Sequence, residues 1–166
     1  MFDSFIAGGN AVVHGASRGL GLEFVRQLLA ESRVARVFAT CRVPAAAVAL
    51  QALALEQPTR LTILPMDLAQ EVAIAEAAQE IARCVSRLHL SVNCAGVLHD
   101  VERRMKPEKR LADVDVGALS YAFTVNAMGP LLLARHFEPL LSHAERVVFA
   151  SISARVGSIG DNRLGG

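Results

Sequence analysis

The chain has 166 residues, enough for one domain with a hydrophobic core and too few for two comfortable ones. Hydrophobic residues make up 52% of it, and its formal net charge at pH 7 is +1. This balance favours a packed globular body and excludes charge-driven binding of nucleic acid. We therefore expect a single domain over residues 1–166 and no nucleic-acid partner.

Targeting and redox features are also absent from the sequence. No apolar run approaches the ~20 residues that a membrane-spanning helix needs, and the start, MFDSFIAGGN, lacks the basic and apolar regions of a secretory signal. The three cysteines, Cys41, Cys84 and Cys94, stand at no metal-binding or disulfide spacing. These features predict a cytoplasmic protein with neither a membrane nor a metal partner.

The first informative segment is VVHGASRGLGLEF, residues 12–24, where three glycines separate a β-branched stretch from an apolar-periodic one. This order predicts strand, tight turn and helix. Glycine permits positive φ and close approach of the backbone, and a helix N-terminus offers unpaired amides to phosphate oxygens. The turn therefore predicts a pyrophosphate cradle, the alternative being a glycine-rich turn without a ligand. The residues assigned to the cradle are Gly15, Ser17, Arg18, Gly19, Leu20 and Gly21.

The second strand, expected over residues 36–41, is followed at once by Arg42. About 20 positions past the glycines of a nucleotide-binding unit, an acidic residue would bind the ribose 2′-hydroxyl, whereas arginine suits a 2′-phosphate. No Asp or Glu occurs from Ser32 to Leu55. This favours NADP(H) over NAD(H), with Arg18 as a second cation. The alternative for Arg42 is an ordinary solvated strand end.

The rest of the chain alternates short strand-like and longer helix-like segments. This alternation predicts a doubly wound α/β domain of the Rossmann type, with five parallel strands in the order 3-2-1-4-5 and a helix joining each pair. The ligand is expected at the carboxyl ends of strands one and four. After the second strand, the expected elements are a helix over 45–57, a strand over 61–66, a helix over 70–85, a strand over 88–92, a loop over 97–115, a helix over 115–141 and a strand over 146–150.

The long helix expected over 115–141 contains Gly129-Pro130. Proline has no N–H, so the carbonyl four residues earlier loses its helical partner and the helix kinks. That carbonyl belongs to Asn126. The sequence therefore predicts a free carbonyl there, the alternative being a kink without chemistry.

Three motifs together resemble the short-chain dehydrogenase/reductase family. They are the turn Gly-x-x-x-Gly-x-Gly starting at Gly15, the run Asn93-Cys94-Ala95-Gly96 after the fourth strand, and the segment 125–130. The segment after the fifth strand resembles the carbonyl-reductase-like branch, related to sniffer and the C-factor protein. His14 stands where the family most often has Thr. The resemblance covers residues 10–166 and implies hydride transfer between a nicotinamide coenzyme and a small carbonyl or alcohol.

The resemblance also implies roles for single residues. The carbonyl of Asn126 would hold a relay water for the active-site lysine, and Ser153 would hydrogen-bond the substrate oxygen, with Ser151 and Ser158 as other alignments. Asp67 would touch the adenine, begin capping the next helix, or do both. The coenzyme-binding set implied by the motifs is completed by Leu68, Asn93, Ala95 and Gly96.

One part of the family's chemistry is missing, namely a tyrosine followed four residues later by a lysine that lowers the pKa of the phenol. Tyr121 is the single tyrosine, Val125 stands four residues later, and the only lysines are Lys106 and Lys109. We therefore expect a truncated chain that lacks the C-terminal strands, keeps the coenzyme-binding portion and turns over little alone. A non-catalytic nucleotide-binding or interaction module is the alternative. The open sheet edge predicts a homo-oligomer.

Overall fold

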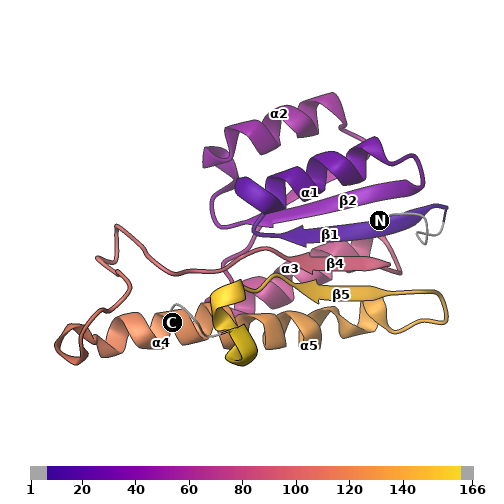
Figure 1. Ribbon diagram of the computed structural model, residues 1–166. Coiled ribbons are helices and arrows are strands. Elements are labelled where there is room, and N and C mark those ends of the chain that lie inside the picture. The colour runs from indigo at the N-terminus through magenta and orange to yellow at the C-terminus, as the bar shows by residue number, and fades with distance from the viewer. Residues whose placement is uncertain (1–6, 162–166) are drawn as a thin grey trace.

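The computed structural model describes residues 7–161, in which strands and helices alternate (Figure 1). The strands form one parallel sheet in the order β3-β2-β1-β4-β5, which confirms the predicted topology. The elements are β1 (Gly9–His14), α1 (Gly19–Ala30), β2 (Val34–Cys41), α2 (Val48–Glu56), β3 (Leu61–Pro65), α3 (Glu71–Cys84), β4 (Leu90–Asn93), α4 (Val116–Phe123), α5 (Gly129–Leu141) and β5 (Val148–Ser151). Short 3-10 turns lie at Pro44–Ala46, Leu111–Asp113, Arg155–Gly157 and Ile159–Asp161.

The helices cover both faces of the sheet, α1 and α2 on one side and α3 and α5 on the other (Figure 1). Side chains of a strand point alternately to the two faces. Accordingly, Ala11 and Val13 of β1 pack in the core beneath α1, whereas Val12 between them packs beneath α3 and α5. The central strand is thus buried on both sides, as a doubly wound sheet requires.

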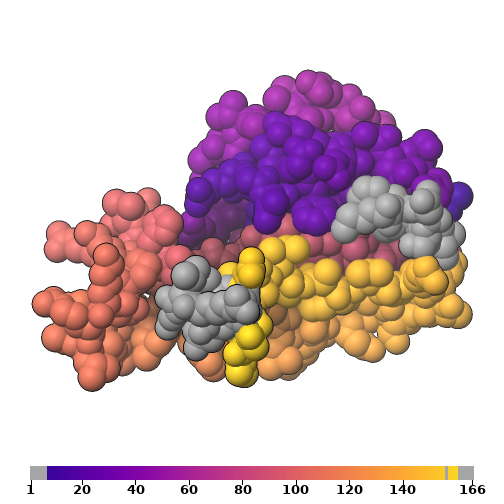
Figure 2. All heavy atoms as spheres, in the orientation of Figure 1, coloured from indigo at the N-terminus to yellow at the C-terminus, as the bar shows by residue number. Residues whose placement is uncertain are grey.

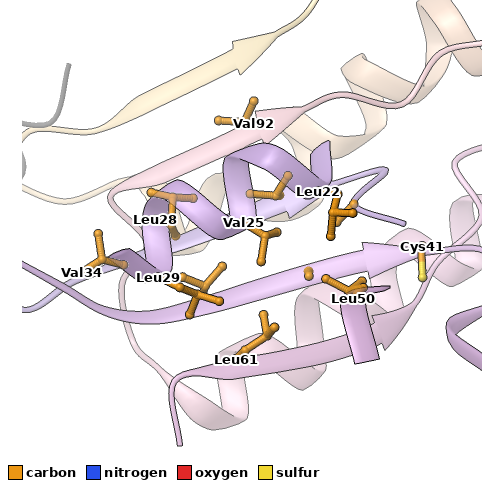
Figure 3. Packing of buried hydrophobic residues seen from close by; sticks show 14 of the residues in the cluster. Leu22, Val25, Leu28, Leu29, Val34, Cys41, Leu50, Leu61 and Val92 are labelled. Atoms are coloured by element: carbon orange, nitrogen blue, oxygen red, sulfur yellow. The ribbon is translucent and has the colours of Figure 1, made fainter. Parts of the chain in front are cut away.

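The core beneath α1 is built by the apolar face that the sequence predicts for this helix. Leu22, Val25, Leu28 and Leu29 are all buried and point towards β1, β2 and β4 (Figure 3). Full burial of each such side chain contributes about 1.5–3 kcal/mol. This packing fixes the position of the helix, and with it the position of the glycine turn that precedes it.

The opposite core joins α3 and α5 to the sheet. Ile74 and Ile81 of α3 and Leu133 and Phe137 of α5 are fully buried, together with Phe38 from β2. At the start of α5, Gly129 lies directly against the loop after β3. A Cβ on Gly129 would lie 2.6 Å from Cγ of Leu68. The helix therefore packs against the Leu68 side chain with no room for a methyl group at position 129.

Between α4 and α5 the chain forms a π-helical segment, Thr124–Met128. Pro130 cannot donate a hydrogen bond to Asn126, and the N–H of Gly129 donates instead to the carbonyl of Thr124, five residues back. The predicted interruption of the long helix is therefore present, and its form is a widened turn rather than a simple kink.

The stretch Val116–Leu141 also has the length and composition to cross a membrane, with a mean hydropathy of 1.4 over its most apolar window. No such stretch was expected from the sequence, because polar residues interrupt the apolar run. Core helices of soluble proteins pass the same test, but those are mostly buried, whereas 17% of this window is buried. In this structure Leu133, Phe137 and Leu140 of that stretch are buried against the sheet.

Candidate functional site

A cleft of about 340 Å³ lies at the carboxyl ends of the strands, where the loops after β1, β2, β3 and β4 meet. In a doubly wound sheet this is the edge at which ligands bind. The structure brings most of the predicted coenzyme-binding residues to this cleft. Those that line it are Gly15, Ser17, Arg18, Gly19, Leu20, Gly21, Arg42, Asp67, Leu68, Ala95 and Gly96.

The glycine turn is shaped so that two of its positions exclude a side chain. Gly15 has a φ of +74°, and a Cβ there would lie 2.7 Å from the backbone nitrogen of Ala95. A Cβ on Gly21 would lie 2.3 Å from the carbonyl oxygen of Gly15. The turn therefore packs backbone against backbone, and this holds the start of α1 next to the end of β4.

The N-terminus of α1 is open to an anion. Its N-cap residue, Arg18, makes no side-chain cap hydrogen bond, and the first turn contains no acidic residue. The first amides of a helix have no partner within the helix, and the helix dipole adds a partial positive charge at this end. Gly19, where a Cβ would meet no atom within 4 Å, leaves the approach to these amides clear.

Behind the turn, His14 lies buried at the end of β1. Its Nδ1 lies 3.1 Å from Oγ1 of Thr40 in β2, and its Nε2 lies 3.2 Å from Oγ of Ser91 in β4. Its ring packs edge-on against Phe137, with 4.9 Å between centroids. Burial lowers the pKa of His14 to about 3, so the ring is neutral. His14 thus bridges the three central strands at the position where the family most often has a threonine hydroxyl.

Arg42 and Asp67 stand at the ends of β2 and β3, on the rim of the cleft. The Arg42 side chain is 59% exposed, as a group that binds a phosphate from solvent would be. The carboxylate of Asp67 accepts a hydrogen bond of 3.0 Å from the N–H of Ala69. Asp67 therefore shapes the turn before α3 but does not cap that helix, whose N-cap residue is Gln70, and it lines the cleft.

Asn93 and Asn126 organise the cleft without lining it. Oδ1 of Asn93 accepts from the N–H of Ala95 at 3.0 Å, and its Nδ2 donates to Oγ of Ser151 at 3.1 Å, so it ties β4 to β5. The Asn126 amide binds both polar backbone atoms of Val97, at 2.8 Å to N and 2.7 Å to O. These bonds hold the segment after β4 against the π segment.

The predicted serine is not brought to the cleft in the structure. Ser153 lies in the exposed segment after β5 and is not among the residues that line the cleft. Ser151 is the last residue of β5 and bonds to Asn93, and Ser158 is exposed farther along. Residues 163–166, where the sequence analysis placed the end of the resemblance, lie outside the described residues.

Sequence reasoning missed several residues that line the cleft. Cys41, Met66 and Cys94 stand at strand ends, a position that could have marked them, whereas Asp100 and Tyr121 come from the loop and α4 and carry no such signal. The others missed are Val97, His99 and Val125. Burial raises the pKa of the Cys94 thiol to about 11, so it remains protonated at neutral pH.

A second polar cluster lies at the opposite end of the sheet, where His89, His143 and Glu145 bring possible ligand atoms within 4.8 Å of one another. Nδ1 of His89 accepts from the N–H of Asn10 at 3.0 Å, so the neutral ring carries its proton on Nε2, 2.6 Å from Glu145. A metal ion bound at Nε2 would need the lone pair of that nitrogen. The proton would then have to move to Nδ1, which could no longer accept the hydrogen bond from Asn10. The cluster therefore links β1, the residue before β4 and the segment before β5 by hydrogen bonds.

Comparison with known proteins identifies the family. The model of the short chain dehydrogenase family matches residues 9–162, and the chain belongs to this family. Among curated relatives, an uncharacterized oxidoreductase of Schizosaccharomyces pombe is 30% identical over 156 residues, which cover 94% of this chain and 55% of the relative. The 3-keto-steroid reductase/17-beta-hydroxysteroid dehydrogenase 7 of Homo sapiens is 26% identical, with 81% and 46% covered. The chain thus spans about half the length of these relatives.

Solved structures place the chain close to carbonyl reductases within the family. The NADPH-bound carbonyl reductase from chicken fatty liver superposes with a TM-score of 0.84 at 32% identity, over 96% of this chain and 62% of that one. The carbonyl reductase Sniffer of D. melanogaster superposes with a TM-score of 0.82 at 26% identity, over 96% and 66%. The carbonyl-reductase-like relationship expected from the sequence is confirmed.

Proposed function

We propose that this chain is the coenzyme-binding portion of an NADP(H)-dependent oxidoreductase that interconverts small carbonyl compounds and alcohols. The observation that carries the proposal is the uncapped N-terminus of α1, which faces a cleft and where neither Gly15 in the preceding turn nor Gly21 in the first turn of the helix has room for a side chain. Dinucleotide pyrophosphates bind at such helix ends.

The residues that would hold the coenzyme follow from this placement. The amides at the start of α1 would bind the pyrophosphate, and Arg42 at the end of β2 would bind a 2′-phosphate through its planar guanidinium. Ala95 and Gly96 leave room beside the nicotinamide ribose. When bound, the nicotinamide supplies the hydride, while this chain's residues bind and orient it. The chicken carbonyl reductase, described as NADPH-bound, supports this preference.

The chemical step needs a general acid that the described cleft does not offer in the family's pattern. Tyr121 lines the cleft, but Val125 stands where the pattern requires a lysine. General acid–base catalysis contributes about 10²- to 10⁴-fold, so these 166 residues alone would bind the coenzyme and turn over little. Within the proposal, Asn126 keeps the relay-water role that the resemblance implies, whereas the substrate-binding role of Ser153 requires the segment after β5 to move to the cleft, because Ser153 does not line it here. The second candidate is a binding or interaction module without catalysis, and it is favoured by the presence of Val125 where the pattern requires a lysine.

The test is a fluorescence titration of the chain with NADPH and NADH, run on the natural sequence and on Arg42→Ala. Arg42→Ala should weaken NADPH binding at least tenfold and leave NADH binding nearly unchanged, because only NADPH carries the 2′-phosphate. Arg26→Ala, on the exposed face of α1 where Arg26 pairs with Glu23, is the matched control for charge. Equal binding of NADPH by all three proteins would contradict the assignment.

A panel of ketones then separates the two candidate functions. NADPH binding without oxidation fits either a coenzyme-binding portion or a binding module, and addition of a chain segment that carries Tyr-x-x-x-Lys should restore turnover only for the former. Measurable NADPH oxidation by the 166 residues alone would contradict the expected inactivity.

We also propose that the chain self-associates in a reducing, cytoplasmic compartment. In the described part of the chain, β5 pairs only with β4, and Val148, Phe149 and Ile152 on and beside it are 38–46% exposed. Exposed apolar strand edges favour association. All three cysteines are free thiols, as expected in a reducing compartment. Sedimentation velocity at increasing concentration tests the association, and a concentration-independent monomer would contradict it.

A further inference from the structure

The loop between β4 and α4 folds back over one end of the cleft as a small hairpin. Asp100 and Met105 form an antiparallel bridge through two backbone hydrogen bonds, of 3.0 and 2.8 Å. Met105 is buried and anchors the hairpin, whereas the turn residues Val101 to Arg104 are exposed. Arg104 adopts a φ of +53°, which costs a residue with a side chain about 1 kcal/mol. In Figure 2 this loop and α4 form the lobe that projects beyond the sheet.

The hairpin brings a carboxylate to the group that the proposed function assigns to the coenzyme. Oδ2 of Asp100 lies 4.0 Å from Nη1 of Arg42, and the Asp100 side chain is only 12% exposed. Its Oδ1 accepts from the N–H of Arg103 at 3.0 Å, which orients the carboxylate. Both Asp100 and Arg42 line the cleft.

Tyr121 completes the arrangement from α4. Its hydroxyl lies 3.5 Å from Nη1 of Arg42, and the guanidinium of Arg103 stacks on its ring at 4.3 Å from the centroid. Stacking of a cation on an aromatic ring is favourable. Arg42 is therefore held from two sides, by Asp100 of the hairpin and by Tyr121 of α4.

We propose that Asp100 is a specificity-determining residue that competes with the 2′-phosphate of the coenzyme for Arg42. This inference rests on the proposed function. A phosphate bound to the exposed side of Arg42 competes with the carboxylate for the guanidinium, and the two negative groups repel each other. A dinucleotide with a free 2′-hydroxyl leaves the Asp100–Arg42 pair in place. Asp100 therefore narrows the preference for NADP(H) over NAD(H) that Arg42 alone would give.

The experiment measures the affinity of 2′,5′-ADP and of 5′-AMP, which differ in the 2′-phosphate, for the natural chain and for Asp100→Asn. Asparagine keeps the Oδ1 acceptor for Arg103 and removes the charge. It should strengthen 2′,5′-ADP binding about 3- to 10-fold at low salt and leave 5′-AMP binding unchanged. Glu102→Gln, an exposed carboxylate in the same hairpin, is the matched control and should change neither affinity.

The possible results separate the inference from the proposed function. Unchanged or weaker 2′,5′-ADP binding by Asp100→Asn overturns the inference while the proposed function stands. Equal strengthening of both nucleotides also overturns it, because the effect then is not specific to the 2′-phosphate. If neither protein binds NADPH or 2′,5′-ADP, both the proposed function and the inference fail. Hydrogen exchange of residues 98–105 should rise with 2′,5′-ADP and not with 5′-AMP.

Discussion

Nδ1 of His14 lies 3.1 Å from Oγ1 of Thr40, inside the core and behind the glycine turn. The ring is neutral because burial lowers its pKa to about 3, and its other nitrogen reaches Ser91 of β4. The His14 side chain thus links β1 to β2 and β4. Unlike a threonine at the same position, it can also take up a proton.

His14 gives the protein a specific sensitivity to acid. In the unfolded chain a histidine has a pKa near 6.5. Below that pH the unfolded state therefore binds a proton at His14 that the native state does not bind until much lower pH. The contribution of neutral His14 to the free energy of unfolding is fully present above pH ~6.5, and it is lost progressively as the pH falls towards 3. Between pH 7 and pH 5 the free energy of unfolding should fall by about 2 kcal/mol from this group alone. Urea denaturation of the natural chain and of His14→Thr checks this, since the variant should show a shallower decline. Parallel declines would contradict the assignment.

Gly19 tests whether an anion lies over the helix. Alanine there meets no protein atom within 4 Å, but it must adopt a φ of +58°, at a cost of about 1–2 kcal/mol in stability. We expect Gly19→Ala to stay folded and to lose at least tenfold in NADPH affinity, because its methyl would stand between the amides and the pyrophosphate. Circular dichroism and fluorescence titration measure the two effects.

Gly8→Ala is the control for Gly19, since it also has a positive φ and an unobstructed Cβ but lies at the other end of β1. It should carry a similar stability cost without a change in affinity. Wild-type affinity in Gly19→Ala would show that the pyrophosphate does not lie there.

Asn126 should act as a clamp on the segment after β4. Replacement by alanine removes both hydrogen bonds to the backbone of Val97, each worth about 0.5–1.5 kcal/mol. We expect a loss of about 1–3 kcal/mol and faster hydrogen exchange at residues 95–99. Thr124→Ala, two residues earlier, removes only a local bond to the carbonyl of Ser120 and should leave that exchange unchanged. Slow exchange in Asn126→Ala would argue against the clamp.

Glu145 gives the stability of the protein a second pH dependence, which arises from a carboxylate rather than from a histidine. A hydrogen bond from His89, and the charge of Arg87 beside it, hold the pKa of Glu145 below its usual value of 4.5. Its contribution to stability is therefore present above pH ~4.5 and is lost as the pH falls through its native pKa. Glu145→Gln should lower the Tm at pH 7 more than the Tm at pH 4, because the contribution of the carboxylate shrinks once the pH falls below ~4.5. Glu56→Gln, exposed on α2, should lower neither value.

The fold could be predicted because its signals are local and repeated. Each strand carries β-branched residues and each helix an apolar stripe, and strand order follows from the right-handed crossover rule. The bounds of the strands differ by two residues at several ends, since β2 begins at Val34 and β5 at Val148, and α2 begins at Val48, three residues later than expected. Hydrogen bonds to neighbouring strands decide such ends, and a single strand's sequence does not contain them.

The glycine turn and the strand-end residues of the cleft could be predicted for a related reason, because a parallel sheet brings its carboxyl ends together. The hairpin at Asp100 could not. It depends on a left-handed turn residue that is an arginine, Arg104, rather than a glycine, and on the burial of Met105 by elements distant in sequence. Nothing in the local pattern there marks a turn, and the charged residues around it suggested a solvated loop.

Gly129 never faces the cleft, yet its smallness has a consequence for it. Because the start of α5 rests against Leu68 with no space for a methyl group, the loop that carries Asp67 and Leu68 is supported from behind by the helix. A larger residue at this position would have to displace the Leu68 side chain, and Leu68 lines the cleft. Gly129 thus influences the shape of that part of the cleft through Leu68, although Gly129 itself does not line the cleft.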